Sequence, residues 1–584
     1  MTGALGTVFV ANRGEIAVRV VRACRDLGLR SVTCYADPDA GSPHTVLADA
    51  SVRLPGDTAA ETYLAADALV RTALAAGADA VHPGYGFLAE DAGFAERVRA
   101  AGLVWVGPSP DAMRALGDKV SARAVARAVG APMAAGTDRP VTGPGEVEAF
   151  ADEHGLPVAV KAARGGGGRG LRVAWTRAEI PDLYASAVRE AEQAFGAGEC
   201  FVERYLPRAR HVEVQVLADD AGGVLVLGTR DCSVQRRHQK LVEEAPAPGL
   251  PDALRTVLHD SAVAICRHAG YTGAGTVEFL VGADGTASFL EVNTRVQVEH
   301  PVSEEVTGID VVVEQLRIAG GARLPVTGVH PVAGHAVELR INAEDPSRGF
   351  VPSPGTVARL RLPGGPGVRV ECGVAEGSSV GLGFDSLIAK VVVWGRDRDQ
   401  ALARARRAVA ETEVEGVRTV LPVHRDLLRD DAFTGPELRV HTRWLEEEYV
   451  PAPDGPDVGR RATAGVVRVG RRRLAVPLPG MPSITGPAAD AAREALTGAG
   501  DGAGGAGIPH DLLVSPIQGS VVRVLVEDGR HVGVGEVVAV VEAMKMENPV
   551  RAGVAGVVAD LAVAVGDSVA QDAPICRLVA DPAA

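Results

Sequence analysis

Strand-like and helix-like patterns alternate through the first 115 residues of this 584-residue chain. Short apolar runs typical of buried strands lie at 8–11, 31–35, 80–82 and 103–106, and stretches of helical periodicity lie between them at 15–27 and 59–76. Strands that alternate with helices favour a parallel sheet wound in βαβ units. The amino-terminal region is therefore predicted to be an α/β domain.

The pattern changes further along the chain. Residues 118–330 mix helices with alternating strands, and residues 331–449 predict a smaller α+β unit that ends in helices at 398–412 and 443–448. From residue 450 the composition shifts to Pro, Gly, Ala and Asp, which predicts a linker with a short Arg-rich hairpin at 466–477. We expect domains at 1–117, 118–330, 331–449 and 511–582, with a linker at 450–510.

The last 72 residues contain an internal repeat. A β-rich run at 521–525, followed by Asp528-Gly529 and Val532, is echoed by a run at 557–561, followed by Gly566-Asp567 and Val569. Short β-rich halves with Asp/Gly turns favour a flattened all-β barrel or sandwich with pseudo-twofold symmetry.

Charge and cysteine content exclude several classes of protein. The formal net charge of −14 disfavours binding to nucleic acid or to an anionic membrane. The seven cysteines are scattered and never spaced as CxxC, which argues against a disulfide framework or a zinc site and fits a reducing cytosol. No stretch of about 18 apolar residues is present to span a membrane. We therefore expect a cytoplasmic protein.

Lysine is scarce, with only five among the sixty basic residues: Lys119, Lys161, Lys240, Lys390 and Lys545. A chain that uses arginine almost everywhere is expected to keep lysine where a compact primary amine is needed. Lys545 lies in Glu-Ala-Met-Lys-Met-Glu-Asn at 542–548, between the two halves of the repeat. Only an amine can form an amide with a carboxylic cofactor, so Lys545 is a candidate attachment site. The alternative is a surface lysine at a turn.

A glycine run follows Lys161 and its strand at 158–160. Glycines expose main-chain N–H groups and let phosphates approach closely, although a plain flexible loop would look the same. Glu278 and Glu291 stand on two strands joined by a Gly/Asp turn, and Asn293 follows. Antiparallel pairing would bring the carboxylates together, where they would suit Mg²⁺ or Mn²⁺. A salt-bridged surface hairpin is the alternative.

Two further runs carry candidate chemistry. Arg295, Gln297 and Glu299 would share one face of an extended segment, where they could bind a small oxyanion and remove its proton. Residues 230–240 form the densest polar run, which is usually a solvated face or a nucleic-acid patch. Within this run Cys232 is interpreted as a buried packing residue.

Taken in order, these motifs resemble the α-chain of biotin-dependent acyl-CoA carboxylases, most closely the short actinobacterial type. Residues 542–548 resemble the attachment motif of biotinyl carrier domains; lipoyl domains share the fold but lack the flanking methionine pair. The resemblance implies a multidomain α/β and α+β fold. It comprises a pre-ATP-grasp domain, an ATP-grasp domain with a lid at about 132–205, a biotin carboxylase C-terminal domain, and a biotinyl/lipoyl-like all-β domain.

The resemblance also implies roles for individual residues. Bicarbonate would be held by Lys240, Arg295, Gln297 and the backbone of Val298; Glu299 would be the base, and Arg340 would stabilise the enolate of biotin. Glu278, Glu291 and Asn293 would bind the metal. Lys390 is interpreted as structural or at a subunit interface. The residues implied for ATP binding are Lys119, Lys161, Gly165, Gly166, Gly167, Gly168, Glu203, Leu206, His211, Gln235, His238, Glu278, Leu280 and Glu291.

The implied reaction is MgATP-driven carboxylation, with bicarbonate, of biotin on Lys545, where a biotin protein ligase attaches it. Transfer to an acyl-CoA would need a separate carboxyltransferase β-subunit in a hetero-oligomer, because nothing here resembles one. An Arg-rich tract at 460–473 is either a docking site for that β-subunit or a small partner, or a solvated hairpin face. Two alternatives stay open: the α-chain of a two-subunit pyruvate carboxylase, and a non-catalytic biotin-carrying scaffold.

Overall fold

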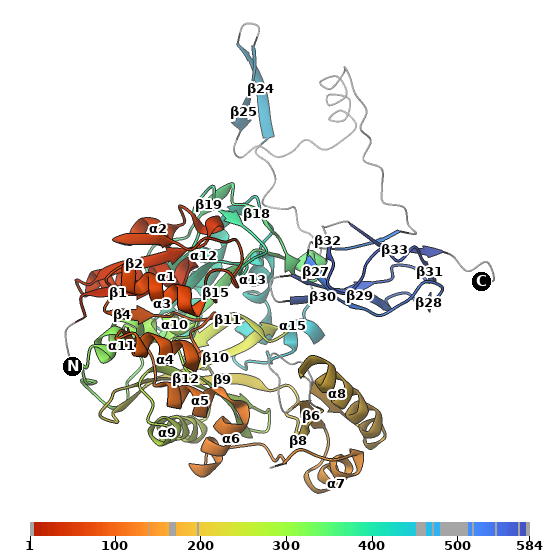
Figure 1. Cartoon of the computed structure of the whole chain (residues 1–584), viewed down its shortest axis with the longest axis horizontal. Coiled ribbons are helices and arrows are strands. Elements are labelled where there is room, and N and C mark those ends of the chain that lie inside the picture. Colours follow the sequence, from red (N-terminus) through yellow and green to blue (C-terminus); the bar gives the residue numbers. More distant parts are fainter. Residues whose placement is uncertain are drawn as a thin grey trace. The chain divides into compact units, whose positions relative to one another are not determined.

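The computed structural model divides into two compact units, Met1–Pro451 and Ala452–Ala584 (Figure 1). It describes residues 5–137, 139–162, 171–195, 198–450, 463–469, 472–478, 512–516, 519–543, 546–569 and 573–579. Lys545 and the glycines Gly165, Gly166, Gly167 and Gly168 lie outside these residues, so their assignments stay predictions. Within the described ranges, every helix is too short or too polar to cross a lipid bilayer.

The first unit begins with a five-stranded parallel sheet in the order β3-β2-β1-β4-β5. Its strands are β1 Thr7–Val10, β2 Arg30–Tyr35, β3 Ala50–Arg53, β4 Ala80–His82 and β5 Val104–Trp105. The accompanying helices include α1 Gly14–Asp26, α3 Ala66–Ala75, α4 Ala92–Ala100 and α5 Pro110–Gly117. The predicted βαβ arrangement is confirmed.

One helix of this region is shorter than its sequence predicts. The periodicity at 59–76 predicts a single helix, but α3 begins at Ala66 and the preceding residues form turns. Tyr63, in these turns, is fully buried, and its hydroxyl donates to Asp39 Oδ2 at 2.6 Å. A buried tyrosine usually satisfies its hydroxyl, and this hydrogen bond holds the segment in its turn conformation.

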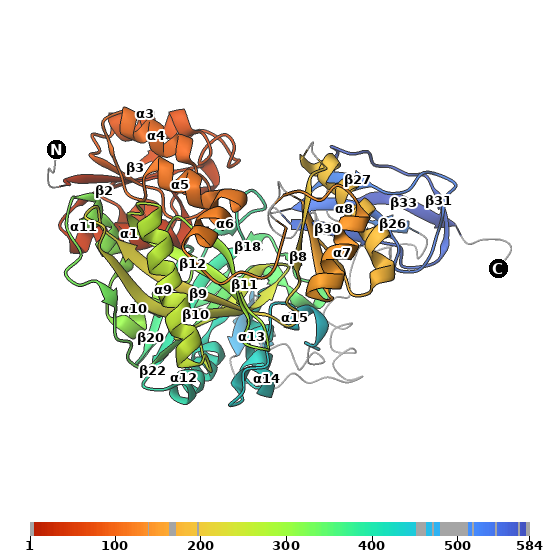
Figure 2. The ribbon, with the colours of Figure 1, turned by 90° about the horizontal axis from the view of Figure 1, so that it is seen from below.

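The centre of the first unit is a nine-stranded sheet in the order β13-β12-β9-β10-β11-β15-β22-β20, with β14 added beside β10. The strands are β9 Arg210–Ala218, β10 Val224–Arg236, β11 Gln239–Ala245, β12 Gly273–Val281, β13 Ala287–Asn293, β14 Gly328–Val329, β15 His335–Asn342, β20 Val368–Cys372 and β22 Leu387–Gly395. Helix α9, Asp252–His268, runs beside β9 and β10 (Figure 2). The pairing of β11 with β15 makes one continuous sheet of strands on both sides of residue 330.

A smaller three-stranded sheet, called the lid below, has the order β7-β6-β8. Its elements are β6 Val158–Ala162, β7 Leu171–Ala174, β8 Cys200–Arg204, α7 Pro144–His154 and α8 Ile180–Phe195. Buried side chains from these strands and helices, among them Val147, Phe150 and Val202, form a hydrophobic cluster separate from that of the nine-stranded sheet. The lid therefore has its own core.

The second unit confirms the internal repeat. Its strands are β26 Leu512–Val514, β27 Gly519–Val524, β28 His531–Val532, β29 Val537–Ala543, β30 Met546–Arg551, β31 Gly556–Ala559, β32 Ser568–Val569 and β33 Pro574–Val579. They form two sheets, β30-β29-β27-β32 and β26-β33-β31-β28. Exchanging each strand for its counterpart in the other half, β26 for β30, β27 for β31, β28 for β32 and β29 for β33, converts one order into the other. This is the pseudo-twofold symmetry predicted from the sequence.

Two hairpins of this unit bear on the predictions. β24 Thr463–Val469 pairs antiparallel with β25 Arg472–Leu478, which confirms the predicted hairpin; the side chains of its Arg-rich tract lie outside the described residues. β29 pairs with β30 so that Ala543 lies opposite Met546. Residues 544 and 545 therefore connect these two strands in the sequence.

Candidate active site

A row of charged side chains crosses the nine-stranded sheet. In register, Glu291 on β13 lies opposite Glu278 on β12, Glu278 lies opposite Glu213 on β9, and Glu213 lies opposite Arg230 on β10. Directly opposite residues share one face of a sheet. Glu213, Glu278 and Arg230 are buried. The predicted antiparallel pairing of the strands that carry Glu278 and Glu291 is thus confirmed.

Lys240, on β11, is the cation at the centre of these carboxylates. Its ammonium contacts Glu213, lies 3.1 Å from Glu278 Oε1 and lies 2.8 Å from Glu299 Oε1. Burial by itself would lower the pKa of Lys240, but the three carboxylates outweigh burial and hold the pKa well above its ordinary value. The three carboxylates therefore favour the charged form of Lys240 at this site.

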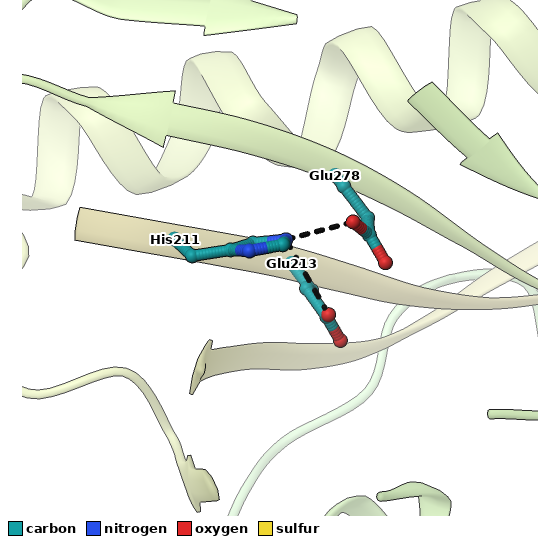
Figure 3. Close-up of side chains that lie close together, drawn as sticks. All are labelled: His211, Glu213 and Glu278. Carbon is teal, nitrogen blue, oxygen red and sulfur yellow. Dashed lines mark hydrogen bonds and ion pairs between the residues drawn. The ribbon is translucent and has the colours of Figure 1, made fainter. Parts of the chain in front are cut away.

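His211 and Glu213 project from β9 toward Glu278 of β12 (Figure 3). His211 Nε2 lies 2.7 Å from Glu278 Oε2 and 3.6 Å from Glu213 Oε1. Burial opposes charge on the imidazole, yet Glu278 raises the pKa of His211 above its ordinary value. His211, Glu213 and Glu278 have the spacing of metal ligands, as do Glu213, Cys232 and Glu299. The Lys240 ammonium contacts members of both groups and supplies the positive charge that a metal ion would bring.

The three predicted metal ligands differ in the contacts that they make. Glu278 and Glu291 supply hard carboxylate oxygens from adjacent strands, and Glu291 Oε2 lies 3.5 Å from the ammonium of Lys119. Asn293 Oδ1 instead accepts from Arg295 Nη2 at 2.9 Å, and its amide nitrogen donates to Glu278 Oε1 at 2.7 Å. Glu278 and Glu291 supply the carboxylate oxygens that suit a divalent cation. To bind it, Glu278 would have to release Lys240 or His211, and Asn293 would have to release Arg295.

Residues 294–299 form a bend and a turn between β13 and α10, His300–Thr307, so the prediction of an extended segment is wrong. Glu90 accepts from the main-chain N–H of Thr294 at 3.1 Å and from Arg295 Nε at 3.0 Å, which draws the chain out of the sheet. The side chains still converge, because Arg295 Nη1 donates to Gln297 Oε1 and Gln297 Nε2 donates to Glu278 Oε1, each at 2.9 Å.

Glu299 is buried and held between two cations. Its Oε1 accepts from Lys240, and its Oε2 accepts from Arg340 Nη2 at 2.8 Å. Burial would raise the pKa of Glu299, but Lys240 and Arg340 together keep the pKa well below its ordinary value. Arg340 Nη2 also lies 2.5 Å from Oε1 of Glu243, a buried carboxyl whose pKa burial raises to about 7.

This arrangement can bind a small anion and accept its proton. Lys240, Arg295 and Arg340 place three positive charges around the Glu299 carboxylate. A bound anion that attracts the Lys240 ammonium would draw this positive charge away from the Glu299 carboxylate. The pKa of Glu299 would then rise, and Glu299 would become a stronger base when the anion is bound.

The remaining predicted residues lie around this centre or in the lid. Gln235 Nε2 lies 3.3 Å from His211 Nδ1, and His238 occupies the β10–β11 turn with a positive φ of 66°. Lys119 opens helix α6, Lys119–Ala128, and Leu280 is on β12. Two predicted residues form a pair of their own: the Lys161 ammonium on β6 contacts Glu203 on β8, with Arg123 Nη1 3.3 Å from the second Glu203 oxygen. Leu206 follows that strand and is buried.

Four families match consecutive parts of the chain. Residues 4–113 match the biotin carboxylase N-terminal domain, and residues 118–327 match the ATP-binding domain of the carbamoyl-phosphate synthase L chain. Residues 338–447 match the biotin carboxylase C-terminal domain, and residues 512–578 match the biotin-requiring enzyme family. The predicted multidomain fold class is confirmed.

One relative spans almost the whole chain. The biotin-dependent acyl-coenzyme A carboxylase alpha3 subunit of Mycobacterium leprae is 52% identical over 589 aligned positions, which cover 98% of each chain. The chain belongs to the family of biotin-dependent acyl-CoA carboxylase α subunits. As a member of that family it is an ATP-dependent biotin carboxylase that also carries a biotin domain.

Other relatives match the first unit of this carboxylase. A pyruvate carboxylase subunit of Methanothermobacter thermautotrophicus is 44% identical over 75% of this chain and 89% of its own. A crystal structure of the biotin carboxylase domain of Hydrogenobacter thermophilus 2-oxoglutarate carboxylase, in complex with MgADP, ADP and bicarbonate, has a TM-score of 0.71. It is 42% identical and covers 76% of this chain and 98% of that one.

Sequence reasoning missed four residues of the candidate site: Glu90, Glu213, Arg230 and Glu243. Arg230 is fully buried and donates to Glu213 Oε2 through Nε at 3.0 Å and through Nη2 at 2.8 Å. A signal was available on β9, where His211, Glu213 and Gln215 alternate with apolar residues after Arg210 at the start of the strand. Polar groups repeated on one face of a buried strand must be paired with one another, which indicates a polar network.

Proposed function

We propose that this chain is the α subunit of an acyl-CoA carboxylase, and that it uses MgATP and bicarbonate to carboxylate biotin carried on Lys545. The observation that carries the proposal is the site around Glu299. A candidate base, Glu299, is held between Lys240 and Arg340. Lys240 also contacts Glu278, whose strand pairs with that of Glu291, so the base lies close to the carboxylate pair suited to MgATP. The match to the biotin-requiring family over residues 512–578 supports the carrier role of the second unit.

Each residue has a separate task in this proposal. Lys240 and Arg295, with Gln297 and the main chain of Val298, bind bicarbonate, and Glu299 accepts its proton. Glu278 and Glu291 would hold Mg²⁺ or Mn²⁺, which would neutralise charge on the phosphates of ATP, and Lys119 lies beside Glu291. Arg340 presents positive charge where oxyanion character develops. Biotin, when bound, supplies the ureido nitrogen that accepts the carboxyl group.

The test uses the full chain co-expressed with a biotin protein ligase. Intact mass should show one added biotin, and Lys545→Arg should abolish it. The biotinylated chain should cleave ATP in a reaction that requires bicarbonate. Lys545→Arg should lose this activity and regain it when free biotin is added, because its carboxylase unit is intact. Absence of bicarbonate-dependent ATP cleavage in the biotinylated chain would favour the non-catalytic scaffold.

The acceptor step requires a carboxyltransferase, which we propose to be a separate polypeptide. The relative that this chain matches end to end is itself named as one subunit of a carboxylase. We further propose that the Arg-rich tract at 460–473 docks a partner. Reversing the charge of its six arginines should disrupt the co-purified complex, and unchanged assembly would reject the docking role.

A second candidate is the α-chain of a two-subunit pyruvate carboxylase. It is favoured by the 44% identity to the pyruvate carboxylase subunit of Methanothermobacter thermautotrophicus. The two candidates share the first half-reaction and differ only in the partner. Mass spectrometry of the co-purified complex separates them, because an acyl-CoA carboxylase would bring a CoA-binding protein, whereas a pyruvate carboxylase would bring a metal-dependent barrel protein.

A further inference from the structure

Lys390 has an environment that its sequence did not indicate. It lies on β22, opposite Arg340 on one neighbouring strand and Glu371 on the other. The side chain is fully buried within this single chain. Of the two interpretations of Lys390, structural or at a subunit interface, its complete burial supports the structural one. Its surroundings are therefore supplied entirely by this chain.

The Lys390 ammonium joins three regions that are distant in sequence. It lies 3.0 Å from Oε1 of Glu15, which is on α1 of the amino-terminal sheet. It donates a hydrogen bond of 2.7 Å to the main-chain oxygen of Val298, in the turn that carries the candidate bicarbonate residues. Tyr85 completes the group, with its ring centroid 5.9 Å from the ammonium and its hydroxyl bonded to Glu15.

The Val298 oxygen belongs to the peptide unit that joins Val298 to Glu299. That peptide unit is planar, so a hydrogen bond to its oxygen also fixes the direction of the Glu299 N–H. The preceding peptide unit is fixed as well, because His300 Nδ1 lies 2.6 Å from the oxygen of Gln297. A carbonyl oxygen can only accept, so His300 Nδ1 carries the proton there. Both peptide units beside Val298 are thus held through their carbonyl oxygens.

The main-chain N–H of Val298 is left available. Val298 is half-buried, and among the described residues no acceptor takes its N–H. The carbonyl oxygens of Gln297 and Val298 are bonded to His300 and Lys390. In a trans peptide unit the N–H points opposite to the carbonyl, so the Val298 N–H points away from His300. It is a free donor beside Arg295, Gln297 and Glu299.

We propose that Lys390 is a positioning residue for bicarbonate: it anchors the 297–299 turn so that the Val298 main chain and the Glu299 carboxylate face the anion. This inference rests on the proposed function and adds a residue to its bicarbonate site. Glu15 holds the Lys390 ammonium in place through their ion pair, and the ammonium holds the 297–299 turn through the Val298 oxygen. Of the residues proposed for ATP and the metal, Glu278 accepts from Gln297 of this turn at 2.9 Å, whereas Lys119, His238 and Glu291 are not bonded to the turn in the described structure. Loss of Lys390 should therefore weaken bicarbonate binding more than ATP binding.

The test compares Lys390→Met with Arg398→Met in the full biotinylated chain. Arg398 is a matched control, since it neutralises the buried carboxylate of Glu244 on the same sheet, at 2.7 Å, without contacting residues 294–299. Lys390→Met should raise the KM for bicarbonate about tenfold or more, while the KM for ATP stays within about twofold. Arg398→Met should leave both KM values within about twofold of wild type. An equal rise in both KM values, or an unchanged bicarbonate KM, would overturn the inference.

A second variant covers the case in which Lys390→Met does not fold. Glu15→Gln removes the charge that fixes the ammonium but keeps the lysine buried, so it should raise the bicarbonate KM by a smaller factor and spare the ATP KM. An unchanged bicarbonate KM in Glu15→Gln would overturn the inference in that case. Wild-type protein without bicarbonate-dependent ATP cleavage would instead reject the proposed function, which separates the two failures.

Discussion

Two lysines of the nine-stranded sheet, Lys240 on β11 and Lys390 on β22, are surrounded differently. The Lys240 ammonium contacts three carboxylates, and 13% of its side-chain surface is exposed. Lys390 is enclosed and divides its contacts between one carboxylate and one main-chain oxygen. A partly exposed ammonium that is shared by three carboxylates can leave one of them for an incoming anion. A fully buried ammonium keeps its contacts and so holds the neighbouring groups in place. One lysine is placed for chemistry and the other for position.

The largest effect is expected at the base beside Lys240. Glu299→Gln keeps the shape of the side chain but cannot accept a proton at neutral pH. It should lower kcat for bicarbonate-dependent ATP cleavage by about 10²–10⁴-fold, the usual contribution of a general base. Steady-state phosphate release measures the loss, and nucleotide binding to the variant serves as the control. A loss of kcat below about fivefold would show that Glu299 is not the general base.

Lys240→Met should lower the same rate by about 10²–10³-fold, as expected when a preorganised charge is removed from an oxyanion site. The loss should persist at saturating bicarbonate, because Lys240 acts on the reacting anion. Lys390→Met should instead be largely restored by high bicarbonate. If saturating bicarbonate restored the rate of both variants, or of neither, Lys240 and Lys390 could not be assigned the separate roles of acting on the anion and positioning the turn.

The carboxyl of Glu243, which lies beside Arg340, should make the stability of the folded protein depend on pH. Burial raises the pKa of Glu243 to about 7 from its ordinary value of 4.5. Between these values the folded protein keeps a proton that the unfolded chain has lost, so stability should fall as pH rises through this window. Across this window the free energy of unfolding of wild type should fall by on the order of 3 kcal/mol more than that of Glu243→Gln. Urea unfolding at about pH 5 and about pH 7.5 measures the difference; parallel curves for both proteins would contradict it.

The smallest effect is expected at the exposed end of the charged row. Glu291→Gln should raise the Mg²⁺ concentration for half-maximal ATP cleavage by about tenfold. The charge of one metal ligand is lost while Glu278 and the Lys240 cluster remain. Titration of activity with Mg²⁺ at fixed ATP measures the shift, with Arg398→Met as the control. An unchanged requirement for Mg²⁺ would place the metal elsewhere.

Local patterns were enough to predict much of the fold. Alternating strands and helices predicted the parallel sheet, and the internal repeat predicted the exchange symmetry of the second unit. The parallel sheet depends on residues that are close together in sequence, and the symmetry of the second unit depends on a sequence pattern that occurs in both of its halves. The segment 294–299 was predicted wrongly as extended, because Glu90, about 200 positions earlier, binds Thr294 and Arg295 and turns the chain.

The sequence by itself determined the residue types of the candidate site: its lysines, the Glu278–Glu291 pair, Arg295, Glu299, and the motif around Lys545. The tertiary structure alone decided how these charges are paired. It brings Glu213, Glu278 and Glu299 to one ammonium, and it places Lys390 against the Val298 turn. The reason is physical: the pKa and orientation of a buried charge depend on burial and on neighbours within a few ångströms, which come from strands far apart in the chain.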